Sequence, residues 1–420
     1  MLGQCRYSYS VLKYCKQKLT FLQTLHNSRK TQISFCSTRC TTGRRVLGIE
    51  TSCDDTGAAV VDEYGNILGN ALQSQTQETV AVGGVIPFHA RDQHKAHIED
   101  VVEQALKEAN VTVKDLDAVA VTVKPGISMC LNVGLSYAKK LVQEHRVPMI
   151  PIHHMEAHAL TARMIEQIDF PFLVLLVSGG HCLLAVAKDI DKFLLLGTAL
   201  DSSPGEAFDK VARRMKLKNL PECYNMSGGA MVEHIAKQGD IEKFPPLEIL
   251  SGNRSCNFSF SGMKTYYMRL IEKEEKEQEI VASNVISNAG DVCASFQYSL
   301  VRHLAKPLHR AFLFSEMREL LPEDGKTLVV SGGVACNQYI QQGLKKVCEK
   351  YDCRLVCPPP HLCTDNGIMI AWNGIEKLKA GRGFAEDPQS QRFIPKVPFG
   401  EDLTSDVANC TIKVRNANLL

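Results

Sequence analysis

The sequence predicts an α/β protein built from two duplicated lobes around a central cleft. The chain has 420 residues, which is too long for one small domain and suits two lobes of ordinary size. A unit of strand, polar turn, strand, turn and strand occurs at residues 46–68 and again at residues 172–197. Each copy is followed by apolar residues at helical spacing and by further strands. Such repetition is typical of duplicated lobes that pack helices against a sheet.

The first copy continues through alternating helices and strands. Its opening strands are separated by a polar stretch at residues 50–56 and by the turn Glu63-Tyr64-Gly65-Asn66. The elements expected next are a helix over 90–110, a strand over 118–123, a helix that follows Pro125-Gly126 and runs through Leu141, and a strand over 148–152. The sequence therefore places the first lobe at residues 44–168.

The second copy repeats this order. Its expected elements are strands over 172–177, 182–187 and 193–197, a long helix over 292–319, and a strand over 327–330. We therefore expect the second lobe to span residues 169–378. Residues 379–420 are expected to form a C-terminal extension that packs back on the first lobe.

The N-terminal segment differs in composition from the rest of the chain. Lys and Arg residues occur there among Ser and Thr residues, and the first acidic residue is Glu50. A basic, acid-free leader with hydroxyl residues is typical of a mitochondrial transit peptide, which we predict over residues 1–43. The predicted localisation is therefore the mitochondrion, and a disordered basic tail is the alternative interpretation.

The remaining composition excludes several classes of protein. A hydrophobic fraction of 45% and a charged fraction of 22% are typical of a globular protein. The net charge of +2 predicts no overall attraction to RNA, so any RNA contact must be local. The longest apolar run, residues 170–187, is interrupted by Ser178-Gly179-Gly180-His181, and a membrane span needs about 20 continuous apolar residues, so we predict none. The 16 cysteines of so long a chain predict reduced, mostly structural thiols.

Three polar turns follow apolar strands and favour an oxygen-rich ligand. They are the turns at residues 50–56, 178–181 and 331–337. Small residues in such turns let backbone N–H groups approach a phosphate closely, and a helix N-terminus favours anions. For one turn alone an ordinary hairpin is the better interpretation, but three turns together favour a nucleotide-type ligand.

The segment His154-Met155-Glu156-Ala157-His158 predicts a metal site. On a helix, residues four apart are separated by about 40°, so both imidazoles project from one face at the spacing of metal ligands. Glu156 lies about 200° from His154 and faces away, which excludes the zinc-protease arrangement. Asp365, in a turn of the second lobe, offers a third ligand. Such donors suit zinc, iron, manganese or magnesium, whereas two histidines satisfied within the core are the alternative.

Six motifs resemble those of the universal tRNA threonylcarbamoyltransferase family, and the basic leader resembles that of its mitochondrial members. In chain order the motifs are Gly48-Ile49-Glu50-Thr51-Ser52-Cys53-Asp54-Asp55-Thr56, His154-Met155-Glu156-Ala157-His158, Val177-Ser178-Gly179-Gly180-His181, Gly205-Glu206-Ala207-Phe208-Asp209-Lys210, Ser331-Gly332-Gly333-Val334-Ala335-Cys336-Asn337 and Cys363-Thr364-Asp365-Asn366-Gly367. They occur in the order of the family and cover roughly residues 46–378.

The resemblance implies a fold, a reaction and a set of site residues. The fold is the actin-like ATPase fold with ribonuclease H-like lobes. The reaction is transfer of a threonylcarbamoyl group from threonylcarbamoyl-adenylate to the N6 amine of the adenosine beside the anticodon of a tRNA, and a homodimer is also compatible. One divalent metal ion per subunit would be held by His154, His158 and Asp365. The adenylate would contact Val177, Ser178, Gly179, Gly180, His181, Asp209, Gly229, Glu233, Gly332, Gly333 and Asn337.

The expected chemistry is direct transfer, because no Ser-His-Asp or Cys-His arrangement is evident in the sequence. Asp54 is the expected catalytic residue that takes a proton from the amine, with Asp55 as the alternative. An ATPase or small-molecule kinase of the same fold and a non-catalytic nucleotide-binding scaffold are the competing interpretations. The histidine pair disfavours a kinase, because kinases of this fold hold Mg²⁺ through carboxylates and water.

Local basic residues are the candidates for RNA contacts. They are Lys139, Lys140, Arg213, Arg214 and Lys264, and for any single one of them an ordinary solvated charge is the alternative. Two positions depart from the family pattern: Lys124 stands where many members have glycine, and residues 217–223 form an insert before Gly228-Gly229.

Overall fold

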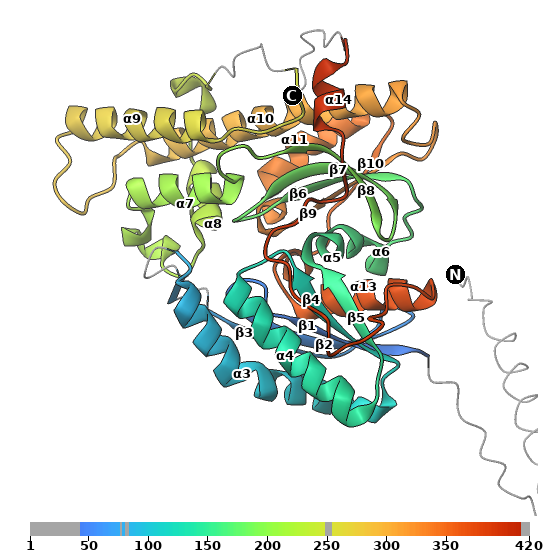
Figure 1. Ribbon diagram of the computed structural model, residues 1–420. Coiled ribbons are helices and arrows are strands. Elements are labelled where there is room, and N and C mark those ends of the chain that lie inside the picture. The colour runs from blue at the N-terminus through green and yellow to red at the C-terminus, as the bar shows by residue number, and fades with distance from the viewer. Residues whose placement is uncertain (1–42, 76–77, 80–83, 248–253, 413–420) are drawn as a thin grey trace, which may run out of the picture. The chain divides into compact units, whose positions relative to one another are not determined.

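The first sheet has five strands in the order β3-β2-β1-β4-β5 (Figure 1). The structure is a computed structural model, which describes residues 43–75, 78–79, 84–247 and 254–412. The strands are β1 (Arg45–Glu50), β2 (Asp55–Asp62), β3 (Ile67–Ser74), β4 (Ala118–Lys124) and β5 (Met149–His153). The first three are joined as antiparallel hairpins, whereas β4 and β5 run parallel to β1. The central strands β1 and β4 are apolar and buried, as expected for a sheet covered on both faces.

The second sheet repeats this topology. Its strands are β6 (Phe172–Val177), β7 (Cys182–Asp189), β8 (Lys192–Thr198), β9 (Thr327–Ser331), β10 (Arg354–Val356) and β11 (Glu401–Asp402), in the order β10-β9-β6-β7-β8-β11. Strands β6 to β8 are antiparallel neighbours, and β9 and β10 run parallel to β6. When β6 is matched to β1, the order of the first five strands is the same in both sheets. The predicted duplication of an α/β lobe is therefore confirmed.

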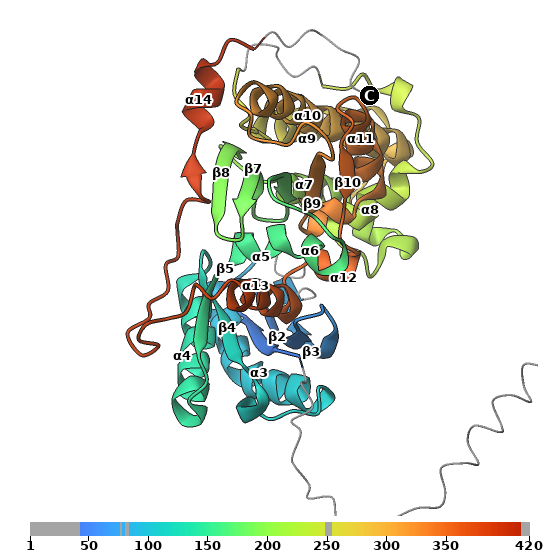
Figure 2. The ribbon, with the colours of Figure 1, turned by 90° about the vertical axis from the view of Figure 1, so that its right-hand side faces the viewer.

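Helices cover both faces of the first sheet (Figure 2). Helices α3 (Pro87–Glu108) and α4 (Ser128–His145) pack on one face, with the short η1 (Val113–Asp115) between them in the chain. Helix α13 (Gly367–Lys379) packs on the other face, against β1, β2 and β4. It also contacts α5 (His154–Leu160), which in turn contacts β6 and β9. Helices α5 and α13 thus form a layer between the two sheets.

The outer face of the second sheet is covered by the remaining helices (Figure 1). Their bounds are α7 (Pro204–Arg214), α8 (Gly228–Ala236), α9 (Ser261–Glu277), α10 (Ala289–Met317), α11 (Gln338–Glu349) and α14 (Thr404–Asn409). Short elements connect the layers: α6 (Ala162–Ile165), η2 (Leu217–Asn219), η3 (Pro221–Cys223), η4 (Ile241–Lys243), η5 (Gly333–Cys336) and α12 (Pro360–Cys363). The insert expected at residues 217–223 forms η2 and η3.

The chain crosses between lobes near its C-terminal end, which differs from the predicted boundary. The sequence places residues 169–378 in the second lobe, but α13 lies on the first sheet. Gly48 and Gly57 allow this contact, because a Cβ at either position would collide with the backbone of the first turns of α13. Periodicity alone does not reveal on which sheet an apolar helix packs.

The C-terminal extension also differs in part from expectation. Its first portion packs on the first lobe. There the Ala385 N–H donates to the Met149 carbonyl at 2.9 Å, and the Ile394 N–H donates to the Val123 carbonyl at 2.8 Å. Its later portion returns to the second sheet, where β11 pairs with β8. Residues 1–42 of the predicted transit peptide lie outside the described residues. No helix among the described residues is long and apolar enough to cross a membrane.

Candidate active site

A cleft of about 810 Å³ lies where strand-end turns of both lobes meet. Ligand pockets commonly measure about 300–1,000 Å³, so a nucleotide-sized molecule fits. Residues of the predicted site line it together: Asp54, His154, Ser178, Gly179, Gly180, His181, Asp209, Gly333 and Asp365. The structure therefore brings two of the three expected metal ligands, His154 and Asp365, into one cavity with the glycine-rich turn.

The three predicted metal ligands lie side by side. His154 and His158 are one turn apart on α5, and Asp365 directly precedes the N-cap of α13. The Nε2 atoms of the two histidines are 3.2 Å apart. Oδ1 of Asp365 lies 3.0 Å from Nε2 of His158 and 3.5 Å from Nε2 of His154. These three donor atoms therefore face one common point.

The geometry of this triad fits a divalent cation. Three ligand atoms that each lie about 2.0–2.2 Å from a shared ion, at tetrahedral or octahedral angles, stand about 3.0–3.5 Å apart, as these atoms do. Both histidines are buried, and the Asp365 side chain is 25% exposed, so the triad is open only toward the cleft. Glu156 turns away and pairs with Lys377 at 3.2 Å, as the helical spacing predicts. Nitrogen and oxygen donors do not by themselves select one metal.

Glu50 orients the first histidine, a role that the sequence did not reveal. Its Oε2 lies 3.2 Å from Nδ1 of His154, which directs the other ring nitrogen toward Asp365. Glu50 is fully buried and accepts hydrogen bonds from the Thr122 hydroxyl at 2.6 Å and the Ser52 N–H at 2.5 Å. A carboxylate behind a metal-binding histidine fixes its tautomer and orientation. The only signal in the sequence is an acid that ends an apolar strand.

The electrostatics of the triad favour an added positive charge. Burial alone would lower the pKa of His154, but the carboxylates of Asp365 and Glu50 outweigh it and raise that pKa to about 9. Burial opposes ionisation of Asp365, yet the neighbouring His154 and His158 hold its pKa below the usual range. A metal ion that binds here must therefore displace a proton from His154, because a ligating imidazole is neutral.

The β6–β7 turn presents backbone to the cleft. Ser178 Oγ accepts hydrogen bonds from the Gly180 N–H at 3.3 Å and the His181 N–H at 3.0 Å, which fixes the turn. A Cβ added at Gly179 or Gly180 would meet no atom within 4 Å, so both glycines border open space. A ligand can therefore approach the main chain here without meeting a side chain.

The third predicted turn packs against the second. Gly332 has φ +102°, a conformation that favours glycine, and a Cβ there would collide with the carbonyl of Val177 at the end of β6. Gly333 begins η5 and lines the cleft. Val177 and Gly332 thus support the turn, whereas Gly333 faces the cavity.

Five of the residues predicted to contact the adenylate do not line this cleft. Val177 and Gly332 support its turns, and the other three make contacts elsewhere. Asn337 is buried and caps α11, because its side-chain oxygen accepts a hydrogen bond from the Ile340 N–H at 3.0 Å. Its side-chain nitrogen donates a hydrogen bond to Gln297 at 2.7 Å. Glu233 accepts from the Gln338 N–H at 2.7 Å and lines a separate pocket of about 300 Å³. Gly229 lies in the first turn of α8, beside Gly228, whose N–H donates to Asp209. Their assignment to the adenylate stays a prediction.

Asp54 and Asp55 line the same cleft as the glycine-rich turn. Asp54 Oδ2 accepts a hydrogen bond from the Thr79 hydroxyl at 3.0 Å. Burial raises the pKa of Asp55 to about 7, in spite of a hydrogen bond from Ser74. Oδ1 of Asp55 is buried and has no hydrogen-bond partner among the described residues. A carboxylate with a pKa near 7, such as that of Asp55, suits a proton acceptor near neutral pH.

Comparison with known proteins connects this cleft to one family. Residues 66–372 match the model of the family described as tRNA N6-adenosine threonylcarbamoyltransferase. A Danio rerio protein named "tRNA N6-adenosine threonylcarbamoyltransferase, mitochondrial" is 51% identical over 376 residues, which cover 90% of this chain and 93% of that protein. Its Homo sapiens counterpart of the same name is 50% identical over 369 residues, which cover 88% and 89% respectively.

More distant similarities concern a bacterial relative and the fold. A protein of Rhizobium johnstonii named tRNA N6-adenosine threonylcarbamoyltransferase is 39% identical over 343 residues, covering 80% of this chain and 90% of that protein. The crystal structure of HypF from T. kodakarensis matches with a TM-score of 0.51 and 15% identity, covering 80% of this chain and 48% of that chain. At this identity the likeness concerns the fold alone. The fold is the actin-like ATPase fold that the motifs implied.

Proposed function

Because the chain belongs to the tRNA N6-adenosine threonylcarbamoyltransferase family, we propose that it transfers a threonylcarbamoyl group to the N6 amine of the adenosine beside the anticodon in mitochondrial tRNAs. The family model covers residues 66–372, and the named relatives are similar along nearly their whole length. The observation that carries the proposal is one cleft lined by His154 and Asp365 of the triad and by the turn of residues 178–181. His158, the third member of the triad, lies 3.0 Å from Asp365. A cation site beside an exposed backbone turn suits a donor with a phosphate and a carbonyl.

Threonylcarbamoyl-adenylate is the proposed donor, and the cleft is its proposed site. The exposed glycines of residues 178–181 and Gly333 would lie against its phosphate, because small residues let an anion approach the main chain. Asp209 lines both this cleft and an adjoining pocket of about 350 Å³. That pocket offers space for the nucleoside, because the Asp209 carboxylate can accept hydrogen bonds from ribose hydroxyls.

One divalent metal ion is the proposed cofactor, held by His154, His158 and Asp365. When bound, it would act as a Lewis acid that stabilises negative charge on the carbamoyl or phosphate oxygens. Glu50 keeps His154 oriented for this role through the contact at 3.2 Å. The cleft walls hold the two large substrates in register, which lowers the entropic part of the barrier.

Transfer is proposed to be direct, with no covalent enzyme intermediate. Cys53 and Cys363 are the cysteines among the described residues that line the cleft. Burial raises the pKa of the Cys53 thiol far above the usual range, and a hydrogen bond with Cys336 together with burial does the same for the pKa of Cys363, so neither carries a thiolate at neutral pH. The amine that attacks the carbamoyl carbon breaks the bond from that carbon to the phosphate oxygen, so AMP leaves, and the amine must lose a proton. Asp54 or Asp55, both on the cleft wall, would accept it.

Product formation with purified protein tests this proposal. The protein is incubated with metal, threonylcarbamoyl-adenylate and unmodified mitochondrial tRNA, and nucleosides of the digested tRNA are measured by mass spectrometry. We expect threonylcarbamoyladenosine at the adenosine beside the anticodon. ATP hydrolysis or phosphorylation of a small molecule without tRNA modification would favour a kinase or ATPase of this fold. Nucleotide binding without any product would favour a non-catalytic scaffold.

Import and self-association are separate parts of the proposal. The relatives named mitochondrial and the basic leader support import into mitochondria. Residues 1–43 fused to a fluorescent protein should carry it into mitochondria, whereas diffuse fluorescence would contradict the leader assignment. A homodimer is also proposed, and sedimentation at several protein concentrations tests it.

A further inference from the structure

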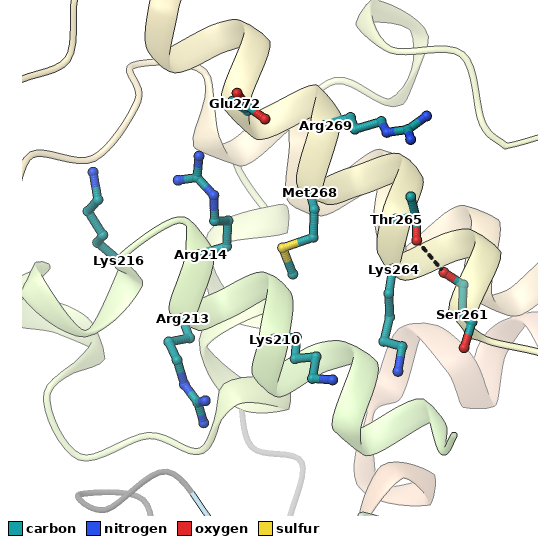
Figure 3. A pocket seen from close by; sticks show the side chains of 10 residues that line it. All are labelled: Lys210, Arg213, Arg214, Lys216, Ser261, Lys264, Thr265, Met268, Arg269 and Glu272. Carbon is teal, nitrogen blue, oxygen red and sulfur yellow. Dashed lines mark hydrogen bonds between the residues drawn. The ribbon is translucent and has the colours of Figure 1, made fainter. Parts of the chain in front are cut away.

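A hollow of about 750 Å³ lies between α7 and α9 and is lined mainly by cations (Figure 3). The cationic side chains of this basic groove are Lys210, Arg213, Arg214, Lys216, Lys264 and Arg269. Glu272 is the acid that lines it, and it pairs with Lys276 at 2.7 Å. In a chain whose net charge is only +2, this is a strong local concentration of positive charge.

Two glutamates hold four of these cations in place. Glu206 lies 2.6 Å from Lys210 and 3.2 Å from Lys264, so it bridges α7 and α9. Glu275 lies 2.5 Å from Arg214 and 3.0 Å from Lys216. Each carboxylate thus faces two cations, which positions their side chains and leaves positive charge in excess.

Two further cations are exposed and carry no ion pair. Arg213 projects from α7 and Arg269 from α9, and neither has a carboxylate within 4.0 Å among the described residues. Figure 3 shows them on the two different helices that border the groove. An exposed guanidinium without an acidic partner is available for a planar oxyanion such as a phosphate.

The basic groove is continuous with the active-site cleft. Lys210 and Arg213 line both cavities, and the cleft also contains Asp365 of the metal triad. A polyanion that lies in the groove would therefore pass the mouth of the cleft. One unit of that polymer would be close enough to enter it.

We propose that the basic groove binds the phosphodiester backbone of the tRNA whose adenosine enters the cleft, an inference that rests on the proposed function. The lining contains hydroxyls at Ser261 and Thr265, which suit phosphate, and no aromatic side chain on which a base could stack. The groove therefore recognises the backbone and not the sequence. It positions the RNA, while the cleft selects the adenosine.

The groove revises the RNA surface that the sequence suggested. Arg213, Arg214 and Lys264 all line it, although they lie on two helices that are far apart in the chain. Lys139 and Lys140 lie on α4 in the first lobe, where Lys139 donates to the Gln389 carbonyl at 2.8 Å and Lys140 faces Glu99 at 3.8 Å. They do not line the groove and are not part of the proposed RNA surface.

Charge removal at Arg269 tests the groove without disturbing the cleft. Arg269 does not line the cleft and has no ion pair with any residue that the structure describes, so Arg269→Gln should fold normally. Arg318→Gln is the matched control, because Arg318 is exposed at the end of α10 and lines neither cavity. Binding of unmodified tRNA and of AMP is titrated separately at several salt concentrations, with Arg269→Glu as the stronger variant.

We expect Arg269→Gln to weaken tRNA binding several-fold and Arg269→Glu to weaken it roughly tenfold or more. The slope of log affinity against log salt should flatten by about 0.7–0.9 per lost phosphate contact. AMP binding and the effect of tRNA sequence should not change, and KM for tRNA should rise while kcat stays constant. Arg318→Gln should match the unaltered protein.

Three outcomes would overturn the groove assignment. They are an unchanged salt slope in Arg269→Glu, a loss of AMP binding with normal tRNA binding, and stronger competition by poly-glutamate than by tRNA, which would indicate an acidic protein partner. The binding titrations need no turnover. A protein that makes no modified nucleoside therefore refutes the proposed function, whereas normal modification with an unchanged salt slope refutes only the groove.

Discussion

The two lobes have the same strand order but carry opposite chemistry at their first turn. After β1, the turn contains Asp54 and Asp55 and follows the buried Glu50, so the first lobe presents carboxylates. After β6, the equivalent turn consists of residues 178–181, whose two glycines leave the main chain open. The region after β1 therefore supplies carboxylates, of which Glu50 contacts His154 of the cation site, and the turn after β6 supplies backbone for an anion.

This difference shows how a duplicated frame can acquire an asymmetric site. The antiparallel hairpins place both turns at the same cleft, because the strand order is shared. The chemistry of each turn depends on a few side chains that contribute little to the sheets. A change at Glu50 should therefore alter metal binding, and a change at Asp54 or Asp55 should alter proton transfer. Changes in the turn of residues 178–181 should alter donor binding, with the fold preserved in each case.

Removal of the histidine pair should have the largest effect on activity and on metal content. His154→Ala with His158→Ala leaves Asp365 as the single member of the triad, so we expect activity to fall to background and about one metal ion per chain to be lost. Metal content and product formation are the measurements. His89→Ala with His97→Ala, on α3, is the control and should keep both. Unchanged metal content in the first variant would rule out the triad as the metal site.

Asp55→Asn should have the next largest effect and tests which acid accepts the proton. Loss of a general base costs roughly 10²–10⁴ in rate. The pKa of Asp55 is raised to about 7 by burial, and a carboxylate accepts a proton only when ionised, so the rate should fall as pH decreases through about 7. A bound cation would lower this midpoint.

The pH profile separates Asp55 from Asp54. Asp55→Asn should remove the fall in rate toward low pH, whereas Asp54→Asn should leave it in place. The reverse result would assign proton transfer to Asp54, the residue that the sequence favoured.

Glu50→Gln should have an intermediate effect, and it tests how much the first lobe contributes to metal affinity. The amide is similar in size but no longer balances the charge on His154, and loss of such a supporting carboxylate costs roughly 10- to 100-fold in metal affinity. Metal titration by calorimetry measures it. Thr122→Val removes only one donor to Glu50 and should cost less. Equal metal affinity in Glu50→Gln would show that the contact does not support the metal site.

Gly180→Val should have the smallest effect and probes the second lobe alone. No atom lies within 4 Å of a Cβ there, so the fold should tolerate the side chain. Its methyl groups would occupy space that the donor needs, and we expect roughly tenfold weaker binding of an adenylate analogue. Metal content should not change. A parallel loss of metal would show that the two turns are not independent.

Much of the fold was predictable because its strands are short apolar runs between turns. The run at residues 172–177 coincides with β6, and the helix expected over 292–319 is α10 (Ala289–Met317). The placement of α13 was not predictable. Its residues from Gly367 to Lys377 are buried almost all round, so no polar face indicates which sheet it covers.

The candidate site was predictable where its residues are neighbours in the chain. His154 and His158 share a helix face, so spacing alone indicated a pair of ligands. Asp365 lies 207 positions after His158. The sequence offered it as a third ligand because it stands in a turn of the second lobe, and the resemblance to a family implied the same set of ligands. Glu50 was missed because it ends an apolar strand, and a sequence does not show whether such a terminal acid is buried or solvated.

The crossing of α13 onto the first sheet fixes the order in which the protein can mature. A growing or imported chain exposes β1 to β5 long before α13 is present, so one face of that sheet stays uncovered while the second lobe is completed. Uncovered apolar faces are the surfaces that chaperones protect. A chain that stopped before residue 365 would keep the histidine pair but lack both its carboxylate and the helix that closes the first lobe. Loading of the proposed metal would therefore be a late event, and it would report that the chain has been completed as far as Asp365.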